Sequence, residues 1–254
     1  MKRAFNSLAL ALLVACASTP KIPANRYGLQ VVPNLATYER TTRVDPDKRL
    51  VDLQSLIPGL VLDIRYATTN NFMHQQLYPV AKAYLRYPAA VALRDIQHEL
   101  AKDNLGLKIF DAYRPYSITE KMWEPIKNPD FVADPSKGSR HNRGAAVDLT
   151  IIDLSTGREL PMPSDYDEFT PRASHDYAEA PEPALRNRVR LRETMTRHGF
   201  EPLPSEWWHY DFRGWKGFEL MDVPLEALRN WRKGNPAYPD RRDCLSSRGT
   251  DTGR

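Results

Sequence analysis

Cysteine is nearly absent from this chain, which has only two among its 254 residues, Cys16 and Cys244. A disulfide framework needs several paired cysteines, and structural zinc sites are usually closed by cysteine sulfurs. We therefore expect no disulfide framework. A metal site in this protein would have to be built from nitrogen and oxygen ligands.

An excess of charge of one sign is also missing. The chain has 36 Lys and Arg against 32 Asp and Glu, and the basic residues are dispersed along it. This distribution lacks the basic patch that is typical of nucleic-acid binding, so no nucleic-acid partner is expected. With 41% hydrophobic residues and no internal repeat, a chain of this length can bury one substantial core.

No apolar run is long enough to cross a bilayer as a helix. The apolar stretch of residues 8–15 follows Lys2 and Arg3, which is the layout of a secretory signal peptide. We expect residues 1–15 to be removed from the mature protein.

The cysteine after this stretch predicts a membrane anchor. Residues 13–16, Leu-Val-Ala-Cys, resemble a bacterial lipobox, which implies cleavage before Cys16 and lipidation of that cysteine. The alternative is an ordinary signal peptide cleaved near Ala15 or Ala17. Position 17 lacks the aspartate that resembles an inner-membrane retention signal, so we expect a periplasmic protein held to outer-membrane lipid. Residues 16–47, with scattered prolines, are interpreted as the lipidated N-terminus and a tether.

Two short segments carry the residues that predict chemistry, 139–148 (SRHNRGAAVD) and 206–209 (EWWH). They supply His141, Asp148 and His209, which are three nitrogen or oxygen ligands. Three such ligands leave one coordination position open, as in catalytic zinc sites. Asp148 lies in an apolar, β-branched stretch typical of a buried strand, where a carboxylate needs a partner. The alternative for each residue is a buried side chain satisfied by ordinary hydrogen bonds.

These segments, Ser-x-His-x6-Asp followed by Glu-x-Trp-His, resemble the D-alanyl-D-alanine dipeptidases of the VanX type, a branch of the zinc D-Ala-D-Ala peptidases. The resemblance extends over about residues 50–215 and includes residues 63–72, 111–115 and 161–167. It implies one zinc ion held by His141, Asp148 and His209, a catalytic carboxylate at Glu206, and a transition-state arginine at Arg114.

Chemical reasoning assigns a role to each of these positions. Zinc lowers the pKa of bound water and polarises the scissile carbonyl, while Glu206 can move the proton of that water to the leaving amine. Three residues are an odd step in a strand, so a regular strand would place Glu206 and His209 on opposite faces. We therefore expect Glu206 to precede the strand, on a turn opened by Pro202 and Pro204. Arg114 follows an apolar strand and suits stabilisation of an oxyanion. The alternative for it is a surface salt bridge, and the resemblance favours the oxyanion role.

A dipeptide also has two charged ends that need partners. The resemblance implies Asp167 as the partner of the ammonium group, with Tyr66 near it, and Ser139 as a further substrate contact. Pro163 stands where the resemblance predicts glycine, so the loop that carries Asp167 is expected to have a different shape.

Helix signals complete the predicted domain, residues 48–233. We expect helices at residues 88–100 with Gly106 as a stop, at 117–123 from a capping box, and at about 183–198 ending at Gly199. The fold class is α+β, with a small antiparallel sheet and flanking helices. The specific fold, like that of the zinc DD-peptidases and the hedgehog domain, is implied by the resemblance. Residues 234–254 have too few apolar side chains to order themselves.

The remaining histidines are expected to play no part in the site. His198 is interpreted as a cation near a helix C-terminus, and His74, His98 and His175 as surface residues.

Three hypotheses for function follow. The first is a zinc D-Ala-D-Ala dipeptidase that acts on peptidoglycan fragments. The second is a carboxypeptidase that removes D-Ala from longer stem peptides. The third is a non-catalytic cell-wall binding module, which would normally lack Glu206 or a metal ligand.

Overall fold

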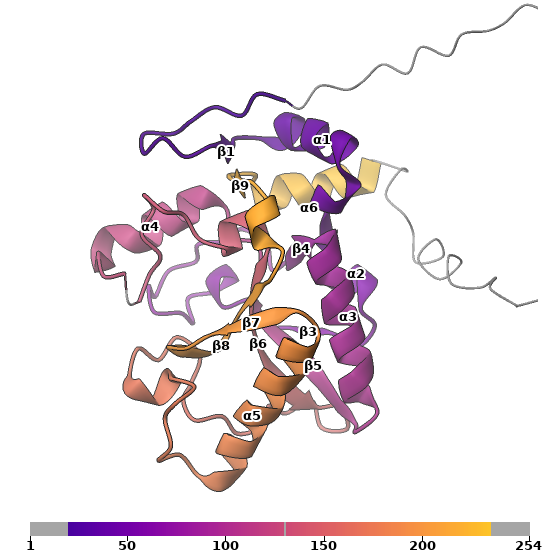
Figure 1. Cartoon of the computed structure of the whole chain (residues 1–254), viewed down its shortest axis with the longest axis vertical. Coiled ribbons are helices and arrows are strands. Elements are labelled where there is room, and N and C mark those ends of the chain that lie inside the picture. The colour runs from indigo at the N-terminus through magenta and orange to yellow at the C-terminus, as the bar shows by residue number, and fades with distance from the viewer. Residues whose placement is uncertain (1–19, 130, 235–254) are drawn as a thin grey trace, which may run out of the picture.

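The computed structural model describes residues 20–129 and 131–234. Its centre is a five-stranded sheet in the order β3-β5-β6-β8-β7 (Figure 1). The five strands are β3 (Val61–Leu62), β5 (Leu105–Asp111), β6 (Ala146–Asp153), β7 (Phe200–Leu203) and β8 (Glu206–Phe212). The α+β class is confirmed, with one correction to the sheet, because the edge strand β3 runs parallel to β5 whereas the other pairs are antiparallel.

The middle strands are apolar because both faces of the sheet are covered. Seven of the eight residues of β6 are buried, and only Asp153 at its end is partly exposed. Its β-branched residues suit a pleated, packed surface. Asp148, the third residue of β6, is therefore only 3% exposed.

Two helices lie side by side across one face of the sheet, α3 (Tyr87–Ala101) and α5 (Glu182–Arg197) (Figure 1). Pro88 stands in the first turn of α3, where its missing N–H costs nothing. Gly199 follows α5 with a φ of 86°, a left-handed conformation that glycine adopts without strain. Both predicted helices are confirmed, but Gly106 does not end α3. It lies inside β5, and the chain turns at Asn104 with a φ of 58°.

The second predicted helix, α4 (Tyr116–Ile126), begins one residue earlier than expected and continues beyond Trp123. The capping-box prediction is wrong, since no side chain of the helix caps its N-terminus. The N–H of Ser117 is instead bonded to Oδ1 of Asp222, at 2.9 Å. The cap is supplied by a residue far along the chain, which a local motif cannot predict.

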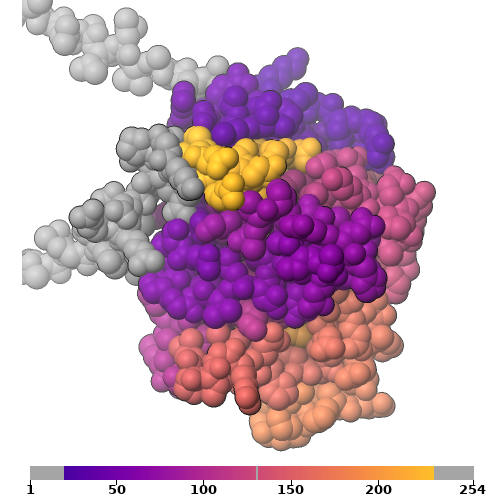
Figure 2. Space-filling view, turned by 180° about the vertical axis from the view of Figure 1, so that it is seen from behind, coloured from indigo at the N-terminus to yellow at the C-terminus, as the bar shows by residue number. Residues whose placement is uncertain are grey.

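The predicted tether is wrong for the part that the structure describes. α1 (Leu35–Val44) is capped by the side chain of Asn34, and β1 (Val31–Val32) pairs in parallel with β9 (Leu220–Met221). The Tyr38 ring lies 5.8 Å from that of Trp231 in α6 (Leu225–Gly234). Figure 2 shows this indigo segment beside the yellow α6. Residues 16–19 and 235–254, with the predicted lipidation site and most of the predicted tail, lie outside the described residues.

The remaining elements are short and connect the larger ones. They are η1 (Pro46–Lys48), β2 (Leu50–Asp52), α2 (Leu53–Leu56), η2 (Arg65–Ala67), β4 (Tyr84–Arg86), η3 (His141–Arg143), η4 (Pro171–Ala173) and η5 (Trp215–Gly217). Within residues 20–129 and 131–234, no helix combines the length and the apolar composition needed to cross a membrane.

Candidate active site

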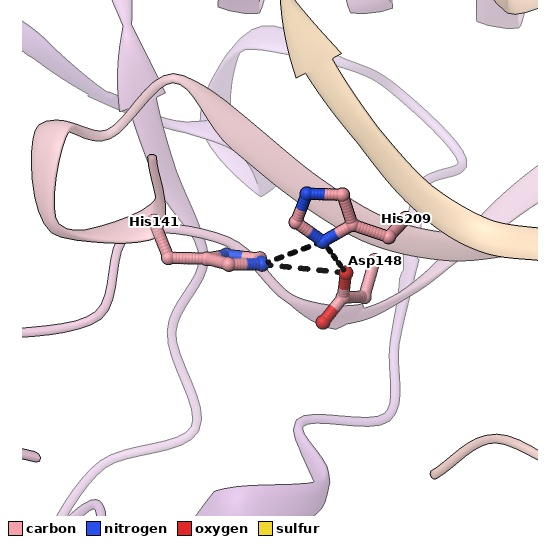
Figure 3. Close-up of side chains that lie close together, drawn as sticks. All are labelled: His141, Asp148 and His209. Carbon is pink, nitrogen blue, oxygen red and sulfur yellow. Dashed lines mark hydrogen bonds and ion pairs between the residues drawn. The ribbon is translucent and has the colours of Figure 1, made fainter. Parts of the chain in front are cut away.

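The three predicted ligands meet at the sheet. Asp148 on β6 pairs directly with His209 on β8, and His141 approaches them from η3, so that the three side chains point toward one another (Figure 3). His141 Nε2, Asp148 Oδ1 and His209 Nδ1 form a triangle with sides of 3.0, 3.1 and 3.3 Å. Zinc bonds of about 2.0–2.1 Å in a tetrahedron would separate ligand atoms by about 3.3–3.4 Å. The donor set and its spacing therefore fit one face of a zinc tetrahedron.

A fixed turn presents His141. Gly144 ends η3 with a φ of 65°, and a Cβ there would lie 2.6 Å from Leu50 Cδ2. Asn142 is fully buried, and its amide donates to Arg114 O and Thr119 Oγ1 at 3.0 and 2.8 Å. These contacts tie the ligand-bearing turn to the segment that follows β5.

Each of the three predicted ligands also has a hydrogen-bond partner outside the triangle. His141 Nδ1 lies 2.7 Å from Ala112 O, and His209 Nε2 lies 3.1 Å from Asp211 Oδ1. Tyr166 donates its hydroxyl proton to Asp148 Oδ2 at 3.1 Å. Such outer contacts fix the imidazole tautomer and the ring orientation. Sequence reasoning missed both Asp211 and Tyr166, although Asp211 stands two residues after His209 and so shares its face of the strand.

The charges of the ligands depend on one another. Burial alone would raise the pKa of Asp148, but the adjacent imidazoles of His141 and His209 outweigh it and hold this pKa below its ordinary value. Burial alone would lower the pKa of His209, whereas the carboxylates of Asp148 and Asp211 raise it well above the ordinary value. A buried carboxylate kept ionised beside two imidazoles is suited to a cation.

Glu206 reaches the same point, although its predicted location needs correction. It is the first residue of β8 rather than part of a turn before the strand, and Pro202 lies inside β7. The β7–β8 pairing is irregular between Pro202 and Leu203. Glu206 thus stands beside the Pro204–Ser205 turn, where the strict alternation of faces does not hold, and its Oε2 is 3.9 Å from His209 Nδ1. Burial, together with Asp148, raises the pKa of Glu206, and His209 opposes the shift.

Arg114 lines the same cavity and is held rigidly. Its Nε and Nη2 both bond Asp111 Oδ2, at 3.0 and 2.8 Å. Its guanidinium lies 5.1 Å from the ring centre of Tyr66, and Tyr78 bonds the other oxygen of Asp111 at 2.9 Å. Burial alone would lower the pKa of Arg114, but Asp111 and the surrounding tyrosines leave it well above the ordinary value. The group is a permanent, oriented cation.

The cavity that joins these groups has a volume of ≈ 350 Å³. Asp167 lines it and accepts from the Tyr66 hydroxyl at 3.1 Å, so the predicted neighbours are indeed together. Asp167 has a φ of 60°, in the left-handed region that aspartate tolerates. Burial, and next Asp148, raise its pKa well above the ordinary value. Ser139 also lines the cavity, while its Oγ accepts from the N–H of His141 at 3.2 Å.

Aromatic side chains also line the cavity. The Phe131 and Phe169 rings stack at 4.8 Å, and Phe72 meets Phe169 edge-on at 5.2 Å. All three line the cavity with Met122 and Trp208. The cavity is therefore lined by both charged and apolar side chains.

The expectation for the other histidines is partly wrong. His74 and His98 are exposed, as predicted, and His198 at the end of α5 bonds Glu99 at 2.7 Å. His175 is buried at 6% exposure, against the ring of Tyr210. It is not among the cavity residues, so it remains separate from the site.

Comparison with known proteins decides the family. The family model described as D-ala-D-ala dipeptidase matches residues 47–221, more than half of the chain. The chain belongs to this family. The family is one of zinc metallopeptidases, and the resemblance predicted from the sequence is confirmed.

Individual relatives agree with this family assignment. A D-alanyl-D-alanine dipeptidase of Escherichia coli (strain K12) is 36% identical over 172 residues, which cover 68% of this chain and 89% of that protein. One of Enterococcus faecium is 32% identical over 63% of this chain and 90% of that protein. The solved structure of VanYB in complex with D-Alanine-D-Alanine aligns at 16% identity and a TM-score of 0.35 over 65% of this chain and 84% of that one, an agreement too low to support an argument.

Proposed function

We propose that this protein is a zinc-dependent dipeptidase that hydrolyses D-Ala-D-Ala. The observation that carries the proposal is that one cavity is lined by three ligands spaced for zinc, a carboxylate that does not belong to the ligand triangle, and an oriented arginine. Family membership and the names of the relatives support the substrate.

Each group then has a task. Zinc, when bound by His141, Asp148 and His209, would lower the pKa of water and polarise the scissile carbonyl. Glu206 takes a proton from the attacking water and passes it to the leaving amine, a role suited to a carboxylate with a raised pKa. Arg114 stabilises the oxyanion that forms on the carbonyl, and Asp111 keeps it oriented.

Asp167 is proposed to receive the substrate ammonium. An ammonium group removed from water needs an acidic partner, and Asp167 supplies a carboxylate at the cavity, bonded to Tyr66. Approach of that cation would favour the ionised form of Asp167, which its burial disfavours. Ser139 is proposed as a further contact with the substrate.

A substrate panel tests the proposal. Free D-Ala-D-Ala and a stem pentapeptide that ends in D-Ala-D-Ala are assayed side by side, with and without a chelator. We expect cleavage of the dipeptide, loss of that activity with the chelator, and recovery when zinc is restored. Preferential release of D-Ala from the pentapeptide would instead support the carboxypeptidase hypothesis. Inactivity on both in the presence of zinc would contradict a peptidase function.

We further propose that the enzyme is an outer-membrane lipoprotein that acts on peptidoglycan fragments in the periplasm. The support is Cys16 after an apolar stretch, and the multiple acyl chains of a lipidated cysteine anchor a protein stably. In a Gram-negative host the wild type should fractionate with outer membranes and incorporate a fatty-acid analogue, whereas Cys16→Ala should do neither. An unlabelled, soluble wild-type protein would contradict the anchor and leave the dipeptidase proposal intact.

A further inference from the structure

Arg140 is a cation at the cavity that the proposed mechanism does not use. It stands between Ser139 and the ligand His141, lines the cavity, and keeps 47% of its side chain exposed. Its guanidinium carbon lies 4.9 Å from the ring centre of Trp215. The side chain thus rests on an aromatic surface with a large part of it open to solvent.

The contacts of Arg140 fix it without using its whole guanidinium. Its Nε lies 3.4 Å from Asp211 Oδ2, and the other oxygen of Asp211 is bonded to His209 Nε2. Within the described part of the chain, no hydrogen bond or ion pair engages the two terminal nitrogens of Arg140. A guanidinium that is held at Nε and rests on a ring keeps its terminal N–H groups available for a carboxylate.

The other cation of the cavity is engaged differently. Arg114 directs both Nε and Nη2 to Asp111, so the edge with which an arginine usually grips a carboxylate is already used. Among the described residues that line the cavity, Arg114 and Arg140 are the two that carry a permanent positive charge. Arg140 is the one whose terminal nitrogens remain to be paired.

Two charged groups that line the cavity are connected to different members of the ligand triangle. Asp167 is linked to Asp148 through the hydroxyls of Tyr66 and Tyr166, whereas Arg140 is linked to His209 through Asp211. A negative and a positive group therefore adjoin the ligand triangle through different ligands. This arrangement suits a short zwitterion whose scissile carbonyl lies between its charged ends.

We propose that Arg140 binds the C-terminal carboxylate of the dipeptide and so requires a free carboxylate one residue beyond the scissile bond. The proposal rests on the dipeptidase function proposed above. It makes Arg140 a determinant of specificity, separate from its support of Asp211.

Removing the negative charge from the substrate isolates this role. D-Ala-D-Ala and D-Ala-D-alaninamide are compared with wild type and with Arg140→Gln. We expect the wild type to prefer the acid, and Arg140→Gln to reduce the ratio of kcat/KM for acid over amide by about 10- to 100-fold, the size of a charge-assisted hydrogen bond. KM for the acid should rise more than kcat falls. Arg140→Lys should recover part of the preference because it restores the charge.

Structural damage would look different. Loss of Asp211 support would lower zinc content and slow both substrates equally, leaving the ratio unchanged, so zinc is measured in every variant. Lys216→Gln is the matched control, because Lys216 also lies against Trp215, at 5.6 Å, but does not line the cavity. It should keep the wild-type ratio.

An unchanged acid-to-amide ratio in Arg140→Gln would overturn the proposal. If neither enzyme cleaves the amide measurably, an unchanged KM for the acid would overturn it equally. A wild type that cleaves neither substrate in the presence of zinc would refute the dipeptidase function itself.

Discussion

Two buried histidines, His209 in strand β8 and His175 packed against that strand, lie in opposite electrical environments. His209, on one face, is 8% exposed, and carboxylates meet both of its ring nitrogens. His175 packs against Tyr210, the next residue of the strand, and is 6% exposed, yet neither of its ring nitrogens has a hydrogen-bond partner among the described residues. The two histidines are thus similarly buried, but only His209 has polar partners at its ring nitrogens among the described residues.

The pKa values follow the partners. Desolvation opposes the charged form of both imidazoles, but Asp148 and Asp211 raise the pKa of His209 well above its ordinary value. For His175, burial, Arg192 and Arg188 lower the pKa to about 4. The comparison teaches that carboxylate partners, rather than burial, distinguish the histidine that is suited to a cation-binding site.

The largest expected effect is on kcat and concerns Glu206, beside the predicted zinc ligands. Glu206→Ala should retain zinc, since Glu206 is not one of the three ligands, and should lower kcat by about 10²- to 10⁴-fold, the usual contribution of acid–base catalysis. Arg114→Ala should also lower kcat with zinc intact. Steady-state kinetics and metal analysis check both, with exposed Glu201→Ala as control. Zinc loss in Glu206→Ala would show that the carboxylate belongs to the ligand set.

His175, which packs against Tyr210, should make the stability of the fold sensitive to acid. The folded-state pKa of His175, about 4, lies below the unfolded value of about 6.5, so the unfolded chain takes up a proton first as pH falls. Stability is therefore lost as pH falls from about 6.5 to about 4, by about 3 kcal/mol from this group. His175→Phe should remove that part of the pH dependence, measured by urea unfolding at pH 7 and pH 4 with chelator present.

Exposed His98→Ala is the control for this experiment, and its pH dependence should match that of the wild type. An acid sensitivity unchanged in His175→Phe would mean that His175 is not the group that titrates.

A smaller effect, on zinc affinity, is expected at Asp211, which contacts the predicted ligand His209. Asp211→Asn weakens the charged partner of His209 Nε2 and should reduce zinc affinity by about 10- to 100-fold, as outer-contact substitutions typically do. Competition with a chromogenic chelator measures the affinity. Exposed Asp165→Asn should behave as wild type, and an equal loss in both variants would point to a general effect of charge.

The smallest expected effect is on the free energy of unfolding and is tested at two buried tyrosines. The Tyr210 hydroxyl has no hydrogen-bond partner among the described residues, whereas that of Tyr166 donates to Asp148. Tyr210→Phe should raise the free energy of unfolding by about 1 kcal/mol and leave zinc affinity unchanged. Tyr166→Phe should lower both. Shifts of the same sign in urea unfolding would contradict this difference between the two hydroxyl groups.

The sequence predicted features whose signals are local. Pro88 and Gly199 marked the two long helices correctly, and the spacing of His141 and Asp148 marked a ligand pair. The cap of α4 could not be found this way, because Asp222 supplies it from the far end of the domain.

Other features depend on packing that a linear pattern does not record. Residues 35–44 form a helix whose Tyr38 meets Trp231 of α6, although the segment was interpreted as a tether. Tyr166 joins the site only because its loop folds back over Asp148. The His175 prediction failed because neighbouring elements, including β8, cover the loop that carries it.

The central claim is that His141, Asp148 and His209 hold the zinc on which activity depends. Metal analysis of purified wild type, His209→Ala and His175→Ala after equal dialysis against zinc tests it most directly. The account predicts about one zinc per chain in wild type and His175→Ala, and loss of most zinc with loss of dipeptide hydrolysis in His209→Ala. Full zinc and activity in His209→Ala would contradict it.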